Sequence, residues 1–205
     1  MKYIQHYYRI EFTTPAFLGD AEQSGRWRTP PFKAQLRQWW RVVYAAKHNY
    51  RVSVSDMRRE EGLLFGNAWL EGDFRKSLVR LRLDRWDEGS LKKSQWPADS
   101  NVTHPEVTNR QVGSALYLGY GPLAYQRCTT LKANAAIQAG EAATLSLAVP
   151  EEHAVLITQA LMLMHHYGTV GGRSRNGWGS YTLKLVEKTS APTDIKPLRD
   201  WRACL

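Results

Sequence analysis

The chain has 205 residues, enough for one large domain with a buried core. Its 28 Lys and Arg outweigh 19 Asp and Glu, and the formal net charge of +9 favours a polyanionic partner, either nucleic acid or an anionic membrane. Eight Trp and ten Tyr suit base stacking and so favour nucleic acid. No apolar run reaches the roughly 18 residues of a membrane span, and the start lacks a signal peptide's apolar stretch. We therefore predict a cytoplasmic protein with no membrane partner.

The cysteine pattern points to neither metal nor disulfide chemistry. Cys128 and Cys204 lie far apart and have no metal-ligand spacing. We expect Cys128 to be semi-buried and Cys204 to be a thiol in a C-terminal tail. The sequence predicts no metal site and no cofactor.

The first predicted element is a strand over residues 3–13, where Tyr8, Ile10 and Phe12 alternate with charged residues. A loop rich in Pro and Gly follows, and a helix is predicted from about Pro30 to Lys47. Thr29 can cap this helix, and proline suits its first turn.

Two stripes run along the predicted helix. At about 100° per residue, its apolar stripe comprises Phe32, Leu36, Trp39 and Val43. A neighbouring stripe carries cations spaced by four, namely Lys33, Arg37 and Arg41. No acid accompanies these cations between the loop of Asp20 and Asp56, so the stripe can meet phosphates. The alternative is a solvated face.

The remaining elements follow in chain order. They are a short helix at 56–65, strands at 77–83 and 141–149, a buried helix at 155–167 that Gly168 ends in the usual C-terminal way, and a strand from Tyr181. Residues 84–110 read as a polar excursion and 112–127 as irregular surface. The order strand, helix, strand, strand, helix, strand is that of the α+β ferredoxin-like fold, whose open sheet face is free for single-stranded RNA.

A glycine-rich run from Gly168 to Gly179 is the densest signal, with five of the fifteen glycines. Glycine leaves no Cβ between a backbone N–H group and an anion, so the run predicts a cradle for a phosphodiester. Arg173 and Arg175 supply planar cations there. The alternative is a mobile surface loop.

Four tryptophans are candidates for the core or for base stacking. Trp39 lies on the apolar stripe and is expected in the core, whereas Trp40 lies between the two stripes and can stack on a base. Trp27 and Trp178, each near arginine in a loop, are expected to be exposed aromatics. For Trp178 the alternative is a plug that docks the glycine-rich loop onto the domain.

Five motifs carry a resemblance to a known family. They are Thr13-Thr-Pro-Ala-Phe-Leu-Gly-Asp20, Arg28-Thr-Pro-Pro-Phe-Lys-Ala-Gln-Leu-Arg-Gln-Trp-Trp-Arg41, Glu61-Gly-Leu-Leu-Phe-Gly66, Tyr117-Leu-Gly-Tyr-Gly-Pro122 and Gly171-Gly-Arg-Ser-Arg-Asn-Gly-Trp-Gly179. In this order the motifs resemble the RAMP superfamily of CRISPR-associated proteins, and within it the Cmr1-like, Cas7-like group of type III-B effector complexes. Members like Cmr1 usually carry two RAMP domains, whereas this chain has room for about one.

The resemblance implies an RNA-binding subunit of a type III effector ribonucleoprotein. Its partners would be guide RNA, target RNA or both, and other effector subunits. It also implies one RAMP domain over 1–190, with an insertion around 84–127 and a tail at 191–205. The predicted RNA-binding residues are Arg26, Arg28, Lys33, Arg37, Trp40, Arg41, Gly171, Gly172, Arg173, Ser174, Arg175 and Asn176.

Two enzymatic alternatives and one structural alternative stay open. Cas7-like relatives cut target RNA with a metal-assisted aspartate in the loop after the first strand, where Asp20 lies with Glu22 two residues on. Cas6-like relatives process guide precursors by metal-free general acid–base chemistry, often through histidine. The histidines of this chain are His6, His48, His104, His153, His165 and His166. The structural alternative is an adaptor that binds only protein neighbours.

Overall fold

The computed structural model describes residues 2–22, 24–70, 72–104 and 107–186. Its main sheet has four strands in the order β10-β1-β9-β2, each antiparallel to its neighbours. The strands are β1 (Tyr3–Phe12), β2 (Arg80–Leu83), β9 (Ala142–Pro150) and β10 (Tyr181–Leu185). The crossover helices are α1 (Thr29–Lys47) and α4 (Ala154–Tyr167). This arrangement is the ferredoxin-like fold, and the predicted α+β class is confirmed.

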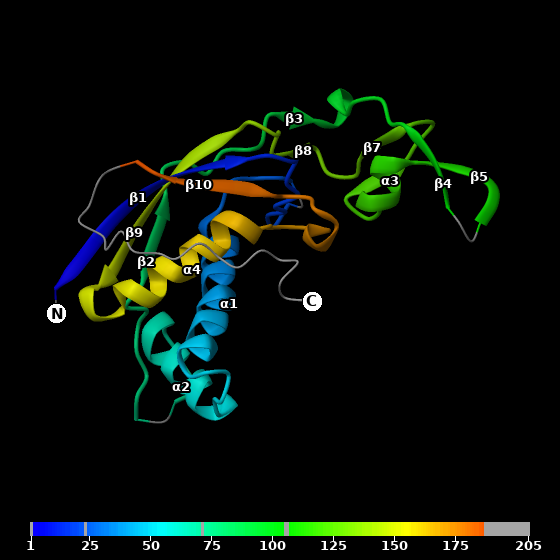
Figure 1. Ribbon diagram of the computed structural model, residues 1–205. Helices are drawn as coiled ribbons and strands as arrows, with labels where there is room; N and C mark the ends of the chain where they lie inside the picture. Colours follow the sequence, from blue (N-terminus) through cyan, green and yellow to red (C-terminus); the bar gives the residue numbers. More distant parts are fainter. Residues whose placement is uncertain (1, 23, 71, 105–106, 187–205) are drawn as a thin grey trace.

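One face of the sheet is covered by helices. Figure 1 shows α1, α4 and α2 (Val54–Phe65) gathered on the same side of the sheet. Strand side chains that alternate toward this side are buried, because each strand turns every second residue to the helices. The core they form with the helices includes Ile10, Phe12, Phe32, Leu36, Leu83, Leu145, Leu147, Ile157, Leu161 and Met164.

The start of α1 differs in detail from the prediction. The residue before the helix is Arg28, and no side chain caps the first turn. Thr29 is instead the first helical residue, and its hydroxyl accepts a hydrogen bond from the Leu83 N–H group at 3.4 Å. The threonine therefore ties α1 to β2, while the proline favoured in the first turn follows it.

The chain between β2 and β9 forms a lobe beside the sheet (Figure 1). Its elements are β3 (Leu91–Lys92), β4 (Asn101–His104), β5 (Val107–Gly113), α3 (Ser114–Gly119), β6 (Leu123–Tyr125), β7 (Thr129–Leu131) and β8 (Ala135–Ala136). The lobe has its own apolar cluster of Leu91, Leu123, Leu131 and Ala136. We call this segment, residues 91–136, the inserted lobe.

The polar excursion and the irregular surface predicted for this region are wrong in the part of it that the structure describes. Asp99 shows how polar residues order the lobe. Its carboxylate accepts hydrogen bonds from the Ala115 and Leu116 N–H groups at 2.8 and 3.1 Å, and from the Ser114 and Thr129 hydroxyls at 2.8 and 3.0 Å. These bonds cap α3 and join it to β7. Cys128, which was expected to be semi-buried, is exposed, and Cys204 lies outside the described residues.

The end of α4 also differs from the prediction. Gly168 follows the helix in an extended conformation with φ −71° and ψ 128°, so it does not form a left-handed C-terminal cap. A Cβ at this position would lie 2.2 Å from the Met164 carbonyl oxygen and 2.5 Å from the Tyr181 hydroxyl. Glycine is required here by close packing against β10. None of the helices described is long and apolar enough to cross a membrane.

Candidate nucleic-acid interface

The glycine-rich loop packs tightly against protein. Gly171 has φ +98°, and a Cβ on it would lie 2.7 Å from the Phe17 carbonyl oxygen. Gly179 has φ +69°, and a Cβ on it would lie 1.9 Å from the Val170 carbonyl oxygen. Both positions combine the left-handed region with backbone contact, so only glycine fits. At these two positions the space that was predicted for a phosphodiester is filled by the chain itself.

Two polar side chains of the loop hold the inserted lobe. Arg173 donates from Nε to the Tyr120 carbonyl oxygen at 2.5 Å, and Asn176 donates from Nδ2 to the Leu118 carbonyl oxygen at 2.7 Å. Both acceptors lie at the C-terminal end of α3, where helix carbonyls lack intrahelical partners. Arg173 and Asn176 therefore link the glycine-rich loop to the inserted lobe. Arg175 is exposed on the same loop.

The tryptophan predictions hold only in part. Trp40 is 2% exposed and packs against Phe65 of α2, so its predicted base-stacking role is wrong. Trp39, which was expected in the core, is half-buried and packs against the core. Trp27 is fully buried, and its indole N–H donates to Glu141 at 3.1 Å. Trp178 contacts Phe17 at a ring-centroid distance of 5.2 Å, which is the plug alternative.

The cationic stripe of α1 faces a buried carboxylate. Arg37 Nε lies 2.7 Å from Glu61 Oε1 and Arg41 Nε lies 2.8 Å from Glu61 Oε2, while Glu61 is 4% exposed. Burial raises the pKa of Glu61, but hydrogen bonds from the two arginines outweigh burial, so its pKa lies below the ordinary value. Lys33 lies beside this pair, and burial together with the Arg37 charge lowers its pKa. The prediction that no acid accompanies the stripe is wrong.

The stripe and the glycine-rich loop lie on different flanks of α1. A small pocket of about 200 Å³ separates the loop from the helix, and its helical wall is Pro31, Ala34, Gln35 and Gln38. Its loop wall includes Ser174 and Gly171. The loop thus meets the glutamine flank, whereas the cations face α2. The loop and the stripe, both predicted to bind RNA, therefore do not form one surface.

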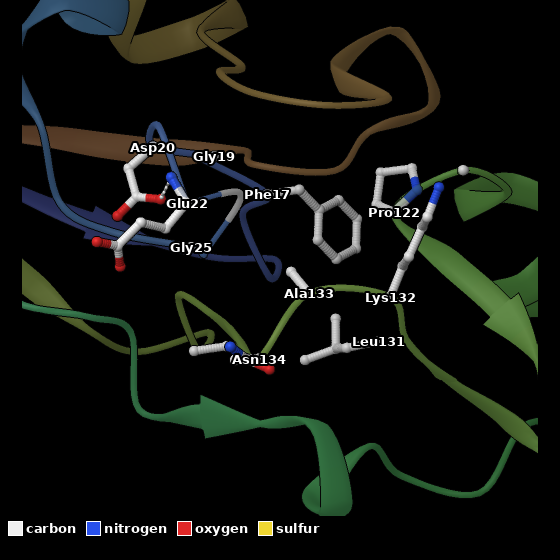
Figure 2. Close-up of a pocket in the computed structure, with 12 residues that line it drawn as sticks. Phe17, Gly19, Asp20, Glu22, Gly25, Pro122, Leu131, Lys132, Ala133 and Asn134 are labelled. Atoms are coloured by element: carbon white, nitrogen blue, oxygen red, sulfur yellow. Dashed lines mark hydrogen bonds between the residues drawn. The ribbon is translucent and has the colours of Figure 1, made fainter.

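A larger cleft lies where three segments meet. Its volume is about 470 Å³, and it is lined by the loop after β1, by the turn before β6 and by the segment between β7 and β8. Figure 2 shows the Phe17 ring between the carboxylates of Asp20 and Glu22 on one side and Pro122 with Lys132 on the other. We call this space the lobe cleft. The sequence did not single out Lys132, and Gly121-Pro122 was placed in irregular surface.

Cations surround the lobe cleft. Lys132 is part of its lining, and Arg28 donates from Nη1 to the carbonyl oxygen of Gly19, a lining residue. The Arg173 guanidinium lies 3.7 Å from the point where a Cβ on Gly121 would be. Arg26 Nε is 3.3 Å from Asp20 Oδ2. Three of the predicted RNA-binding arginines, Arg26, Arg28 and Arg173, therefore lie around this cleft.

The sequence profile of the RAMP superfamily matches residues 9–182. The chain belongs to the RAMP superfamily. The match runs from β1 to β10 and so includes the sheet, the glycine-rich loop and the inserted lobe. No curated protein sequence matches the chain.

Solved structures of CRISPR-associated proteins align with the chain at low identity. A chain of a type IV-B CRISPR complex aligns with a TM-score of 0.53 and 15% identity, covering 98% of this RAMP chain and 99% of that one. Cmr1 from Pyrococcus furiosus, in its apo form, aligns with a TM-score of 0.47 and 17% identity, covering 91% of this chain and 50% of that one. A chain of the type III-B Cmr-beta complex bound to cognate target RNA gives 0.45 and 14%, covering 89% and 59%.

The carboxylate of Asp20 in this RAMP chain bonds to groups of its own loop. Its Oδ1 accepts hydrogen bonds from the N–H groups of Glu22 and Ser24, each at 2.9 Å, and its Oδ2 faces Arg26. The carboxylate therefore closes a turn, as Asp commonly does. Among the residues that the structure describes, no three His, Cys, Asp or Glu side chains group as a metal site would require.

The histidines are distributed among separate roles. His165 accepts a hydrogen bond at Nδ1 from the Leu183 N–H group at 3.1 Å, and burial together with the nearby His166 and Lys184 charges lowers its pKa. His6 is 3% exposed under the helices, and burial lowers its pKa. His48 ends α1 beside Tyr44, His153 lies 3.6 Å from Glu152, and the side chain of His104 lies outside the described residues.

Proposed function

We propose that this RAMP protein is an RNA-binding subunit of a CRISPR effector complex, with guide RNA, target RNA or both as ligand and other effector subunits as partners. The superfamily membership and the five-motif resemblance support this proposal. The resemblance favours a type III assembly, and the likeness to a chain of a type IV-B complex adds a second assembly of the same general kind. We further propose that residues 1–190 act as one RAMP domain, with an insertion around 84–127 and a tail at 191–205.

The lobe cleft is the observation that carries the proposal. The ring of Phe17 is half-buried and is supported by Trp178 and Trp96 at centroid distances of 5.2 and 6.2 Å. A ring fixed in this way offers a platform for one base. Lys132 and Arg28 bring cations to the same space, and lysine and arginine are the usual phosphate contacts.

The two walls of the cleft differ in charge. Asp20 and Glu22 lie on one wall, and Lys132 lies on the other (Figure 2). A phosphodiester chain is repelled by the carboxylates and attracted by the cations, so we propose that the RNA backbone contacts Lys132 on one wall and Arg28, which bonds the Gly19 carbonyl oxygen, on the other. Glycines at positions 19, 25 and 121 keep the lining low and allow close approach.

The test is the salt dependence of RNA binding by the full chain. Fluorescence anisotropy of a labelled, mixed-sequence single-stranded RNA is measured between roughly 50 and 200 mM salt. We expect the double variant Arg28→Gln, Lys132→Gln to bind more weakly and to flatten the log-log slope by about 1.4, because each lost phosphate contact removes about 0.7. Glutamine at position 28 keeps a donor for the Gly19 carbonyl.

The matched control is Lys47→Gln with Arg51→Gln, which removes two cations at the far end of α1. Both residues are exposed and distant in sequence from every cleft segment. The control is expected to keep the wild-type slope within about half a contact. Equal slopes for the cleft variant and the wild type would contradict the proposed site, and absence of RNA binding by the wild type would contradict the function.

A further inference from the structure

The sheet face opposite the helices carries cations and aromatic rings. In the register of the sheet, Arg80 pairs with Ala148, Arg82 pairs with Ser146 and Arg9 pairs with Lys184. Paired residues of antiparallel strands point to the same side, and these side chains alternate with the buried ones. Arg9, Arg80, Arg82 and Lys184 are all exposed. We call this surface the open sheet face.

Two of these arginines are held against aromatic rings. The Arg80 guanidinium carbon lies 5.0 Å from the centroid of the Tyr3 ring, and that of Arg82 lies 5.4 Å from the centroid of Trp86. Trp86 is 48% exposed. Such stacking fixes the orientation of a guanidinium group and leaves its N–H donors free for an anion.

The side chains that lie between these cations are small, and some of them carry hydroxyl groups. Strand β9 turns Ala142, Thr144, Ser146 and Ala148 to this side, and Tyr7 pairs with Ser146 from the neighbouring strand β1. Hydroxyl groups can contact phosphate and ribose, and the small side chains allow a backbone to approach. An aromatic ring beside a row of small residues leaves room for one stacked base.

We propose that the open sheet face binds single-stranded RNA as a surface separate from the lobe cleft. Four cations stand against two carboxylates, those of Glu11 and Asp84, and Glu11 Oε2 lies 3.3 Å from Arg9 Nε. The carboxylate of Asp84 nearby accepts a hydrogen bond from the Thr144 N–H group at 2.9 Å. The charge therefore favours a polyanion.

The small side chains of the open sheet face also disfavour a protein partner. The centre of a protein interface is apolar and is anchored by large side chains. Between the arginines, β9 contributes alanine, serine and threonine to the open sheet face, and the rings of Tyr3 and Trp86 are occupied by stacked guanidinium groups. A flexible polyanion with flat bases fits this surface better than a folded protein surface does.

The inference rests on the proposed RNA-binding function but uses none of the lobe-cleft residues, so the two can be tested apart. The full chain carrying Arg80→Gln and Arg82→Gln is compared with the cleft variant and with the Lys47→Gln, Arg51→Gln control in the same salt titration. The labelled RNA is long enough to reach both surfaces. We expect the Arg80, Arg82 variant to flatten the log-log slope by about 1.4, and the combined sheet and cleft variant to flatten it by about 2.8.

A second variant tests the base contact separately from the charge. Tyr7→Ala is expected to weaken binding by about fivefold or more with an unchanged slope, because stacking contributes without ion release. Circular dichroism verifies that each variant is folded. A wild-type slope in the Arg80, Arg82 variant overturns the inference while a flattened slope in the cleft variant preserves the proposed function. If the Arg80, Arg82 variant keeps RNA binding but no longer assembles with other subunits, the face is a protein interface and the inference is overturned.

Discussion

Glu61 is the residue on which the cationic flank of α1 depends. It is 4% exposed and bonds both Arg37 and Arg41, whose side chains are 39% and 49% exposed. Removing its charge leaves two half-solvated guanidinium groups without their buried acceptor. We predict that Glu61→Gln lowers the free energy of unfolding by about 2 kcal/mol, a value reduced because water screens the exposed arginines. Urea denaturation measures this change.

The control and the pH dependence sharpen this prediction. Glu60→Gln, one residue away and half-buried, is expected to change stability by less than about 0.5 kcal/mol. The folded-state pKa of Glu61 is lowered, so its contribution is complete above the unfolded pKa of about 4.3 and is lost as the pH falls through the folded value. A stability gap between wild type and Glu61→Gln that persists unchanged in strong acid would contradict this account.

The burial of a side chain was predictable only where the periodicity of its own helix is enough to decide it. Helical periodicity placed Phe32, Leu36 and Val43 in the core, as the structure confirms. Periodicity placed Trp39 rather than Trp40 in the core, because it could not show that α2 covers the flank of α1 that bears Trp40. The same unseen neighbour supplies the carboxylate that pairs with the cationic stripe.

At the scale of elements, the glycine-rich loop is a packed structural element that links the main sheet to the inserted lobe. Gly179→Ala places a Cβ 1.9 Å from the Val170 carbonyl oxygen at a positive φ, whereas Gly177→Ala has a positive φ and no neighbour within 4 Å. We predict that Gly179→Ala costs about 3 kcal/mol or more and Gly177→Ala about 1 kcal/mol of unfolding free energy. Urea midpoints of the two variants compare them directly. Equal costs would mean that the loop is not packed as described.

The bonds between the glycine-rich loop and the inserted lobe also predict how the local stability of the lobe changes when they are removed. Arg173→Ala with Asn176→Ala removes the two bonds from the loop to the end of α3. We expect amide hydrogen exchange to speed up by roughly tenfold across residues 114–125 and to stay constant in β1 and β9. Arg175→Ala on the same loop is the control and should leave exchange in the lobe unchanged. Faster exchange throughout the sheet would show a global effect instead.

The longest strands of the sheet and its crossover helices were predictable because each is long enough to show a period. The strands at 3–13 and 141–149 and the helices at 30–47 and 155–167 were each placed within a few residues. The inserted lobe was not, because its strands are two to seven residues long and several of its contacts depend on the single carboxylate of Asp99. Short strands held by side-chain caps leave no alternation to read.

At the scale of the whole molecule, the net charge of +9 predicts a polyanionic partner but does not identify the surface that would bind it. The five motifs identified the superfamily, and the structure places the glycine-rich loop beside the loop after β1, where the Gly172 N–H group donates to the Phe17 carbonyl oxygen. Where the cations point depends on packing between distant segments. The structure turns the α1 stripe toward α2 and brings Arg28, Arg173 and Lys132 together around the lobe cleft.

Ultraviolet crosslinking of bound single-stranded RNA to the full chain, followed by mass spectrometry of the crosslinked peptides, tests the lobe cleft most directly. We predict crosslinks to peptides from residues 13–28 and 120–135, with Phe17 as a principal site because its ring faces the cleft (Figure 2). The Phe17→Ala variant should lose that crosslink. Crosslinks confined to residues 33–61, where the α1 stripe meets α2, would contradict the account.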